Sequence, residues 1–286
     1  MTSASMSWPA PVATTRVGRW RDRLDRLPPW VWLLAQAAAL WPHWRWAAAR
    51  VADGSDDPLG LAALGVLLLA IWRAAPQMHA APAPWALAGA LLATAAATAA
   101  HLVAPPLVGA LIAAIALACA VAALLPPGMP VLPLAGLSVL ALPVVSSLQF
   151  YAGYPLRVLT AQLSTWALQL GGVAAERSGS AMQVDGQWVI VDAPCSGVQM
   201  AWLAYFTACA MAWVAGSRDA RTLSQLPWVG VLVLLGNAVR NTLLVLMEAR
   251  WHGIPGWAHE AVGLAMLTLV CGAVAAVMFK GSARHG

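Results

Sequence analysis

The chain passes from a polar loop into an apolar run at residues 192–199, whose sequence is DAPCSGVQ. Pro194 ends the polar loop, and Ser196 and Gly197 begin an apolar run that extends to about residue 215. A run of about 20 apolar residues is the length that a helix needs to cross the hydrocarbon core of a membrane. The sequence therefore predicts that a membrane-spanning helix begins here, with Cys195 in its first turn.

The composition of the whole chain is that of a polytopic membrane protein. Of its 286 residues, 61% are hydrophobic and 9% are charged, and the mean hydropathy is +0.72. The net charge of +5 comes from basic residues scattered at the ends of apolar runs, which form no basic face for nucleic acid. We expect an all-α polytopic integral membrane protein with no nucleic-acid partner.

Apolar runs separated by proline, glycine or charged residues predict about eight transmembrane helices. The runs lie at about residues 29–49, 59–75, 84–103, 107–125, 131–149, 197–215, 226–247 and 257–279. We expect residues 29–280 to form a single integral membrane domain, with the candidate chemistry in about residues 130–280. A basic cytoplasmic segment, residues 1–28, precedes this domain, and a cytoplasmic tail, residues 281–286, follows it.

The distribution of basic residues predicts which side of the membrane each helix end faces. By the positive-inside rule, the arginines before the first apolar run keep that end in the cytoplasm; they are Arg16, Arg19, Arg21, Arg23 and Arg26. A cleaved signal peptide is the alternative, but residues 41–46, WPHWRW, make a poor small-residue cleavage site. Arg218 and Arg221 then fall on the inner side, and Cys195 lies on the outer face.

Two segments before Cys195 differ from the apolar runs. Residues 156–175 interleave polar and apolar side chains, which predicts an amphipathic helix at the outer interface that does not cross the membrane. In residues 180–191 the pattern changes, and Val184-Asp185-Gly186-Gln187 is typical of a two-residue hairpin turn. A short β-hairpin is therefore expected to lead into Cys195.

Cys195 is the candidate nucleophile. The first turn of a helix presents unpaired backbone N–H groups and the positive end of the helix dipole, which favour a thiolate over a thiol. The alternative is a small buried residue at a helix start. The other cysteines, Cys119, Cys209 and Cys271, lie inside apolar runs and form no CxxC pair, so neither a disulfide framework nor a zinc site is predicted.

Two ionisable residues near the predicted outer face are candidate partners of the thiol. Arg240 lies inside an apolar run, where a charge is costly unless it is used or paired. Asn237 and Glu248 share its helical face, so the alternative is a structural arginine that pairs with Glu248 or a headgroup. His259, at the outer start of the last run, can transfer protons near neutral pH, although a capping or interfacial role is equally open. His252 in the preceding loop is its rival.

Four motifs resemble, in order and spacing, those of the exosortase/archaeosortase family of polytopic transpeptidase-like membrane enzymes. They are YPLR at residues 154–157, APCSGV at 193–198, GNAVR at 236–240, and HE at 259–260 followed by Gly263. The resemblance covers about residues 130–280 well and the preceding apolar runs only in hydropathy. One departure is Pro194, which stands where many members have a small residue.

The resemblance implies roles for individual residues. Cys195 is the implied nucleophile of a thiol protease or transpeptidase, and Arg240 and His259 complete its site. Supporting roles are expected from other residues of the same motifs, namely Asn237, Ser196, Gly197 and Arg157. The implied reaction is acyl transfer through a thioester on Cys195, which water or an acceptor amine at the cell surface or on a lipid then resolves. No metal or organic cofactor is required.

The resemblance also implies partners and a location. Members of the family are thought to recognise exported proteins that end in a short motif, an apolar helix and a basic tail, and to cleave near the motif. The expected location is the bacterial cytoplasmic (inner) membrane, with the site facing the periplasm and membrane lipid around it, often alongside exopolysaccharide genes. The alternative from another class is a transporter or scaffold component of exopolysaccharide export, in which Cys195 is incidental.

Overall fold

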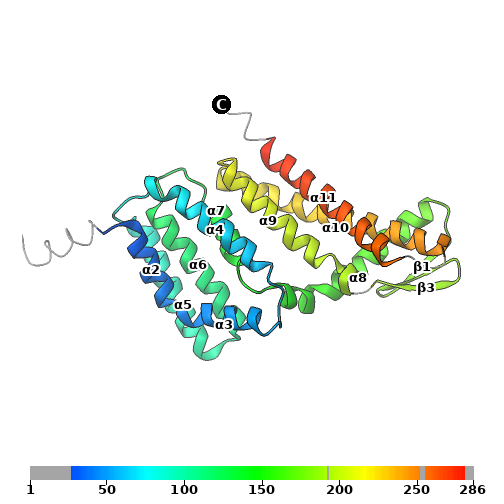
Figure 1. Cartoon of the computed structure of the whole chain (residues 1–286), viewed down its shortest axis with the longest axis horizontal. Helices are drawn as coiled ribbons and strands as arrows, with labels where there is room; N and C mark the ends of the chain where they lie inside the picture. The colour runs from blue at the N-terminus through cyan, green and yellow to red at the C-terminus, as the bar shows by residue number, and fades with distance from the viewer. Residues whose placement is uncertain (1–26, 192, 252–254, 281–286) are drawn as a thin grey trace, which may run out of the picture.

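The computed structural model describes residues 27–191, 193–251 and 255–280 (Figure 1). Most of the predicted basic segment, residues 1–26, lies outside this part, as do the predicted tail, residues 281–286, and His252. The described chain is mostly helical. In Figure 1, helices α2 to α6 lie together on one side, and α9, α10 and α11 run side by side on the other.

The N-terminal helices follow the apolar runs, with one correction. They are α2 (Pro29–Ala39), α3 (Trp41–Ala52), α4 (Gly60–Ala74), which the short η1 (Ala75–Gln77) extends, α5 (Pro84–Val103) and α6 (Pro106–Leu124). The run at 29–49, predicted as one helix, is divided into α2 and α3 at Leu40. Pro42 explains the break, because its ring clashes with the carbonyl four residues earlier and it has no N–H to donate. Pro42 is instead accommodated in the first turn of α3.

The next two helices also differ from the prediction. We expected one span at about 131–149 and a separate amphipathic helix at 156–175. The structure has α7 (Leu132–Leu140) and α8 (Val145–Leu170), with a bend of 95° between them. Pro143 lies in this bend, whereas Pro155 is tolerated inside α8. The predicted boundary was wrong because a proline does not always end a helix. Its fixed φ suits helical geometry, so it removes one backbone hydrogen bond, and the helix continues where packing stabilises the neighbouring turns.

A three-stranded antiparallel sheet follows α8, in the order β1 (Ala175–Ser178), β2 (Ala181–Val184) and β3 (Gln187–Ile190). The turn between β2 and β3 is Asp185-Gly186, where the sequence placed it, with Val184 opposite Gln187. Both turn residues have positive φ, 50° and 85°, as a type I′ hairpin turn requires. Strand β1 was not predicted. One face of the sheet packs on α8, where Met182 and Val184 meet Ala161 and Leu168.

The last part contains η2 (Ala193–Ser196), α9 (Val198–Val214), α10 (Asp219–Trp251) and α11 (Gly256–Phe279). Small residues let these helices approach closely. A Cβ built on Gly236 of α10 would overlap Val270 of α11, and one on Gly136 of α7 would meet Cys209 of α9. In Figure 1, α8 crosses the end of α9, α10 and α11 at which α9 begins.

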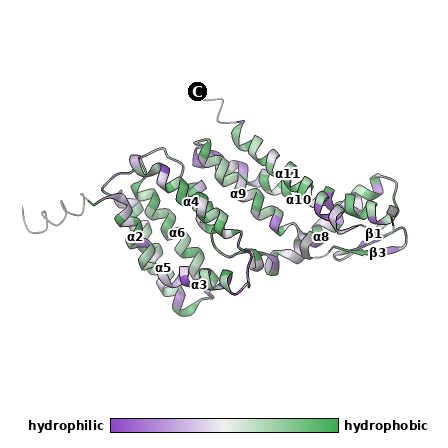
Figure 2. Cartoon of the chain, viewed as in Figure 1, coloured by the Kyte–Doolittle hydropathy of each residue, from purple (hydrophilic) through white to green (hydrophobic). Residues whose placement is uncertain are grey.

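Five helical segments in the described residues are long and apolar enough to span a membrane, or six if the bent pair α7 and α8 counts as one. The five are α4 with η1, α5, α6, α10 and α11, and α9 is a shorter apolar helix of 17 residues. Figure 2 shows hydrophobic residues predominating along them. The chain is thus a polytopic helical membrane protein, and the count of eight helices stays a prediction.

Three aspartates link segments distant in sequence at opposite ends of the bundle. Asp56 Oδ1 accepts a hydrogen bond from the N–H of Ser146 at the start of α8 (3.1 Å), and Gln199 in α9 donates to Asp57 Oδ2 (3.0 Å). The acidic turn at residues 54–58 therefore lies at the Cys195 end of the bundle. At the other end, Asp219 Oδ1 accepts from the N–H groups of residues 131 and 132 (both 2.9 Å). An acceptor at a helix start satisfies N–H groups that the helix itself leaves unpaired.

Candidate active site

Cys195 lies in η2, just before α9 and not in its first turn as predicted. Gly197 separates the two elements because its φ of +84° is left-handed, a conformation that glycine adopts without steric cost. A Cβ at this position would also lie 2.9 Å from Asn237 Nδ2. Gly197 thus allows both the turn of the chain and the close approach of α10.

Asn237 of α10 fixes the turn that carries Cys195. Its Nδ2 donates to the carbonyl of Cys195 and to Thr160 Oγ1 of α8, both at 2.9 Å. A carbonyl can only accept, so the amide must present its nitrogen to Cys195. The residue is 2% exposed, which makes these bonds costly to lose. Three segments distant in sequence are therefore joined at the backbone of the candidate nucleophile.

His259 of α11 meets the thiol of Cys195. The distance between Cys195 Sγ and His259 Nε2 is 4.0 Å, and both residues are half-buried. His259 lies in the first turn of α11, which begins at Gly256. In a contact of this kind an imidazole can act as the base that takes the proton of a cysteine thiol.

Arg240 reaches the same region from α10. Its guanidinium passes over Gly263 of α11, where a built Cβ would lie 3.3 Å from Nε and 3.4 Å from Nη2. Gly263 is one helical turn after His259, and Arg240 is three residues after Asn237. Arg240 is half-buried, while Glu248, its alternative partner in the sequence analysis, is exposed two turns further along α10. The fold thus brings Cys195, His259 and Arg240 into one region.

The remaining supporting residues divide into two cases. Ser196 is buried, donates to Gln149 Oε1 of α8 (2.8 Å) and accepts from the N–H of Val198 (3.3 Å). Arg157, in contrast, contacts its own helix: Nε donates to the carbonyl of Gly153 (3.4 Å), and the guanidinium lies over the ring of Tyr154. Arg157 therefore makes its contacts within α8, whereas Ser196 is part of the Cys195 turn.

Sequence reasoning missed the polar contacts between α8 and α10. Asn237 bonds to Thr160, and four residues later Asn241 Nδ2 donates to Ser164 Oγ (3.0 Å). Ser164 also donates to the carbonyl of Ala238 (3.2 Å). Thr160 and Ser164 are four residues apart on one helix, as Asn237 and Asn241 are on the other. That matched spacing of polar residues in two apolar helices was the available signal.

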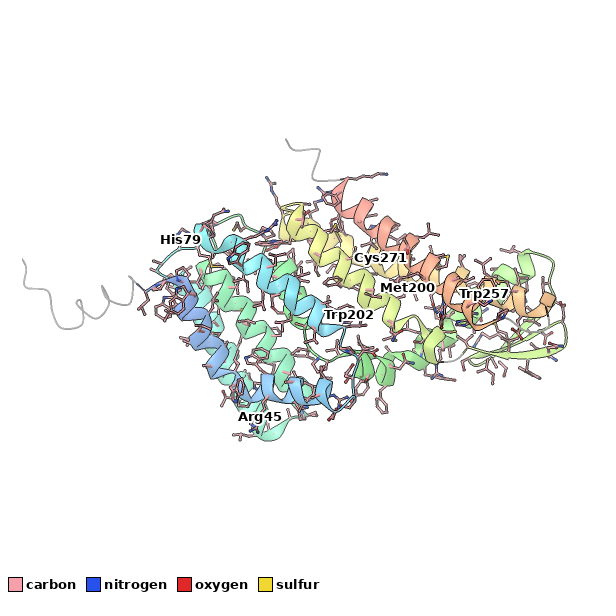
Figure 3. The ribbon with its side chains drawn as sticks, viewed as in Figure 1. Arg45, His79, Met200, Trp202, Trp257 and Cys271 are labelled. Atoms are coloured by element: carbon pink, nitrogen blue, oxygen red, sulfur yellow. The ribbon has the colours of Figure 1, made fainter. Side chains whose placement is uncertain are left out.

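The other cysteines lie away from this region. Cys209 is buried in α9, and Cys271 lies further along α11 than His259, as Figure 3 shows by its position relative to Trp257 near the start of that helix.

A cavity of about 190 Å³ lies beside the Cys195 turn. Its lining includes Ser196, Gly197, Asn237, Tyr205 and Gly230. Within the described ranges, no three or more His, Cys, Asp or Glu side chains are grouped so that they could hold a metal ion.

Comparison with known families gives one match. The family model described as transmembrane exosortase matches residues 46–276. This range includes the Cys195 turn, Asn237, Arg240 and His259. No curated protein and no solved structure matches the chain.

Proposed function

The chain belongs to the transmembrane exosortase family, and we propose that it is a membrane cysteine transpeptidase that processes exported proteins. Its substrates would carry a C-terminal sorting tag composed of a short motif, an apolar helix and a basic tail. Cleavage would occur near the motif, at the outer face of the bacterial cytoplasmic membrane.

The observation that carries this proposal is the 4.0 Å contact between Cys195 Sγ and His259 Nε2. His259 takes the thiol proton as Cys195 Sγ attacks the carbonyl carbon of the scissile peptide bond. When the tetrahedral intermediate collapses, the C–N bond breaks and His259 returns the proton to the leaving amine. The released tag leaves with a new N-terminus, and the rest of the substrate stays on Cys195 as a thioester.

Arg240 and Asn237 have different roles in this scheme. Arg240, which lies against the same helix as His259, is positioned to stabilise negative charge on the tetrahedral intermediate or on a substrate carboxylate. Its planar guanidinium suits two parallel hydrogen bonds to such a group. Asn237 acts as a positioning residue, because its side chain holds the backbone carbonyl of Cys195.

A water molecule or an acceptor amine then attacks the thioester carbonyl and releases Cys195 as the leaving group, which takes up a proton. With water the product is a carboxylic acid, and with an amine on a lipid or surface polymer it is a new amide. The membrane setting fits a substrate whose tag includes an apolar helix, since such a helix is stable beside the apolar helices of the enzyme.

The test is processing of a tagged reporter in cells. The reporter is a periplasmic protein fused to the C-terminal segment of a protein encoded in the same genome that ends in a short motif, an apolar helix and a basic tail. Cys195→Ala should abolish the shortened product, whereas Cys209→Ala, at a buried thiol in α9, should retain it. A transporter or scaffold of exopolysaccharide export would tolerate both changes equally, and that outcome would reject the enzymatic proposal.

A further inference from the structure

The two edge strands of the sheet, β1 and β3, differ in whether another element covers them. Just before β1, the carbonyl of Ala174 accepts a hydrogen bond from the N–H of Asp185 (3.0 Å), so the alternation of an antiparallel ladder directs the carbonyl of Ala175 away from β2. Gln169 of α8 donates to that outward carbonyl at 2.8 Å. At Ala175 the β1 edge is therefore covered by α8, on which the sheet also packs. The rest of β1, Glu176 to Ser178, is exposed but carries charged or polar side chains, of the kind that shield an edge strand.

The β3 edge is open. The two-residue turn makes Val184 and Gln187 a hydrogen-bonded pair, and at the other end Val191 N–H donates to the carbonyl of Ser180 (3.0 Å). The N–H and C=O groups of Trp188 and Ile190, which lie between, must then point away from β2. Within the part of the chain that the structure describes, no hydrogen bond reaches these outward groups.

The same two residues carry exposed side chains. Trp188 is 62% exposed and Ile190 is 64% exposed, and both lie on the face of the sheet opposite Met182 and Val184, which pack on α8. Edge strands of β-sheets are normally shielded by charged side chains, proline or a covering element. An uncovered edge with two large apolar side chains is instead the kind of surface that accepts an extended peptide as an added strand.

The position of β3 indicates which extended peptide would bind at this edge. The strand ends at Ile190, five residues before Cys195, and Val191 and Cys195 belong to one apolar cluster between the sheet and α8. A chain laid along the edge of β3 therefore continues toward the thiol. We propose that the edge of β3 binds the extended substrate segment that precedes the scissile bond, as a fourth strand parallel to β3. This inference rests on the proposed function.

The direction follows from the substrate. Its apolar helix comes after the scissile bond and occupies the membrane, so only the preceding segment is free to lie on the sheet. That segment runs toward the bond that Cys195 attacks, as β3 itself runs toward Cys195. Backbone hydrogen bonds then supply affinity that does not depend on sequence, and Trp188 and Ile190 contact alternate substrate side chains.

A different use of this surface is anchoring in lipid headgroups, which aromatic residues favour. Anchoring would depend on the Trp188 ring and not on the N–H of Ile190. Loss of that N–H also leaves the sheet intact, because β3 does not use it to pair with β2. The two uses are therefore separated by proline, which removes the N–H and is tolerated at an edge position of this kind.

The experiment compares Ile190→Pro with Ile190→Val, which keeps the N–H, and with Arg177→Pro, which removes an outward N–H from the opposite edge, at β1. Processing of the tagged reporter should fall at least tenfold in Ile190→Pro and stay within about threefold of wild type in Arg177→Pro. Ile190→Val should process at least threefold more reporter than Ile190→Pro, because only proline removes the N–H. Alkylation of Cys195 by iodoacetamide should be within twofold in all, which shows an intact site. Normal processing by Ile190→Pro would overturn the inference while the activity of the wild type still supports the proposed function. No processing by the wild type would instead reject the proposed function.

If Ile190→Pro fails to accumulate, cross-linking decides. A photoreactive benzoylphenylalanine replaces Trp188 or, as the control on β1, Glu176, in a Cys195→Ala background that retains the reporter uncleaved. Capture of the reporter at position 188 should exceed that at position 176 at least fivefold. Equal capture at both positions, or none at position 188, would overturn the inference.

Discussion

Gly263 of α11 lies directly beneath the guanidinium of Arg240 of α10, so close that a Cβ there would approach Nε to 3.3 Å. The two residues explain how a charged side chain fits between two apolar helices. The missing side chain of Gly263 leaves the space through which Arg240 extends along the face of α11 that carries His259 one turn earlier. The location of Arg240 therefore depends on a residue with no chemistry of its own.

The first prediction follows from this contact. Gly263→Leu should displace the guanidinium and lower processing of the tagged reporter at least tenfold, while the protein still accumulates in the membrane. Gly272→Leu, on the same helix, is the matched control, because a Cβ at Gly272 would have nothing within 4 Å. Immunoblots of membrane fractions measure both product and enzyme, and equal processing by the two variants would contradict the role of Gly263.

A second prediction concerns Gly197, where two effects can be separated. Alanine at a left-handed φ costs about 1–2 kcal/mol, and this cost is shared by Gly197→Ala and Gly172→Ala, since φ is +84° and +77°. Only at Gly197 does the new Cβ also meet Asn237, at 2.9 Å. We expect Gly172→Ala to lower the melting temperature slightly and keep activity, whereas Gly197→Ala loses processing at least tenfold. Thermal unfolding in detergent and the reporter assay measure the two effects, and similar activities would show that the Asn237 contact is unimportant.

A third prediction concerns the thiol itself. In variants that retain a single cysteine, Cys195 should react with iodoacetamide at pH 7 at least tenfold faster than Cys209, which is buried. His259→Ala should slow the alkylation of Cys195 several-fold, because Nε2 lies 4.0 Å from Sγ and accepts its proton in the proposed mechanism. His79→Ala is the control, since His79 is exposed and lies at the far side of the molecule in Figure 3. Intact-mass spectrometry follows the reaction. An unchanged rate in His259→Ala would remove the imidazole from the mechanism.

The fourth prediction concerns sidedness. The acidic turn and the sheet share the end of the bundle that carries Cys195, while the α9–α10 link lies at the other end. In a background without the four native cysteines, Ser55→Cys and Ser178→Cys should react with a membrane-impermeant maleimide added to spheroplasts. Ser224→Cys, also at an exposed position, should react only after permeabilisation. Labelling of Ser224→Cys in intact spheroplasts would reverse the orientation.

Much of the fold was predictable where local signals agree. Apolar runs bounded by Pro84 and by residues 105–106 gave α5 and α6 almost to the residue, and Asp185-Gly186 located the hairpin turn. The break at Leu40 and the continuity of α8 through Pro155 were missed. In both cases a proline decides the outcome only together with the packing around it, which a single sequence does not contain.

The candidate site, like the fold, could be predicted from the sequence only in part. The sequence made Cys195, Arg240 and His259 candidates because polar groups in or beside apolar runs are costly and therefore need a reason; their roles stay a prediction. Thr160 and Ser164 were missed, since an isolated hydroxyl in an apolar helix most often bonds to its own backbone, as Thr165 does with the carbonyl of Ala161. Their partners on α10 are 77 residues away in sequence, and only the fold identifies them.

The order of synthesis gives the bond between Asn237 and Cys195 a further consequence. Cys195 leaves the ribosome before α10 and α11, so its turn has neither the Asn237 side chain that holds it nor the imidazole of His259 until both helices have been inserted. A chain that stalls after α9 therefore carries the thiol in an unassembled setting. Cys195, Asn237 and His259 therefore come together only when the last helix is in place, so under the proposed function an incomplete chain would lack the complete site.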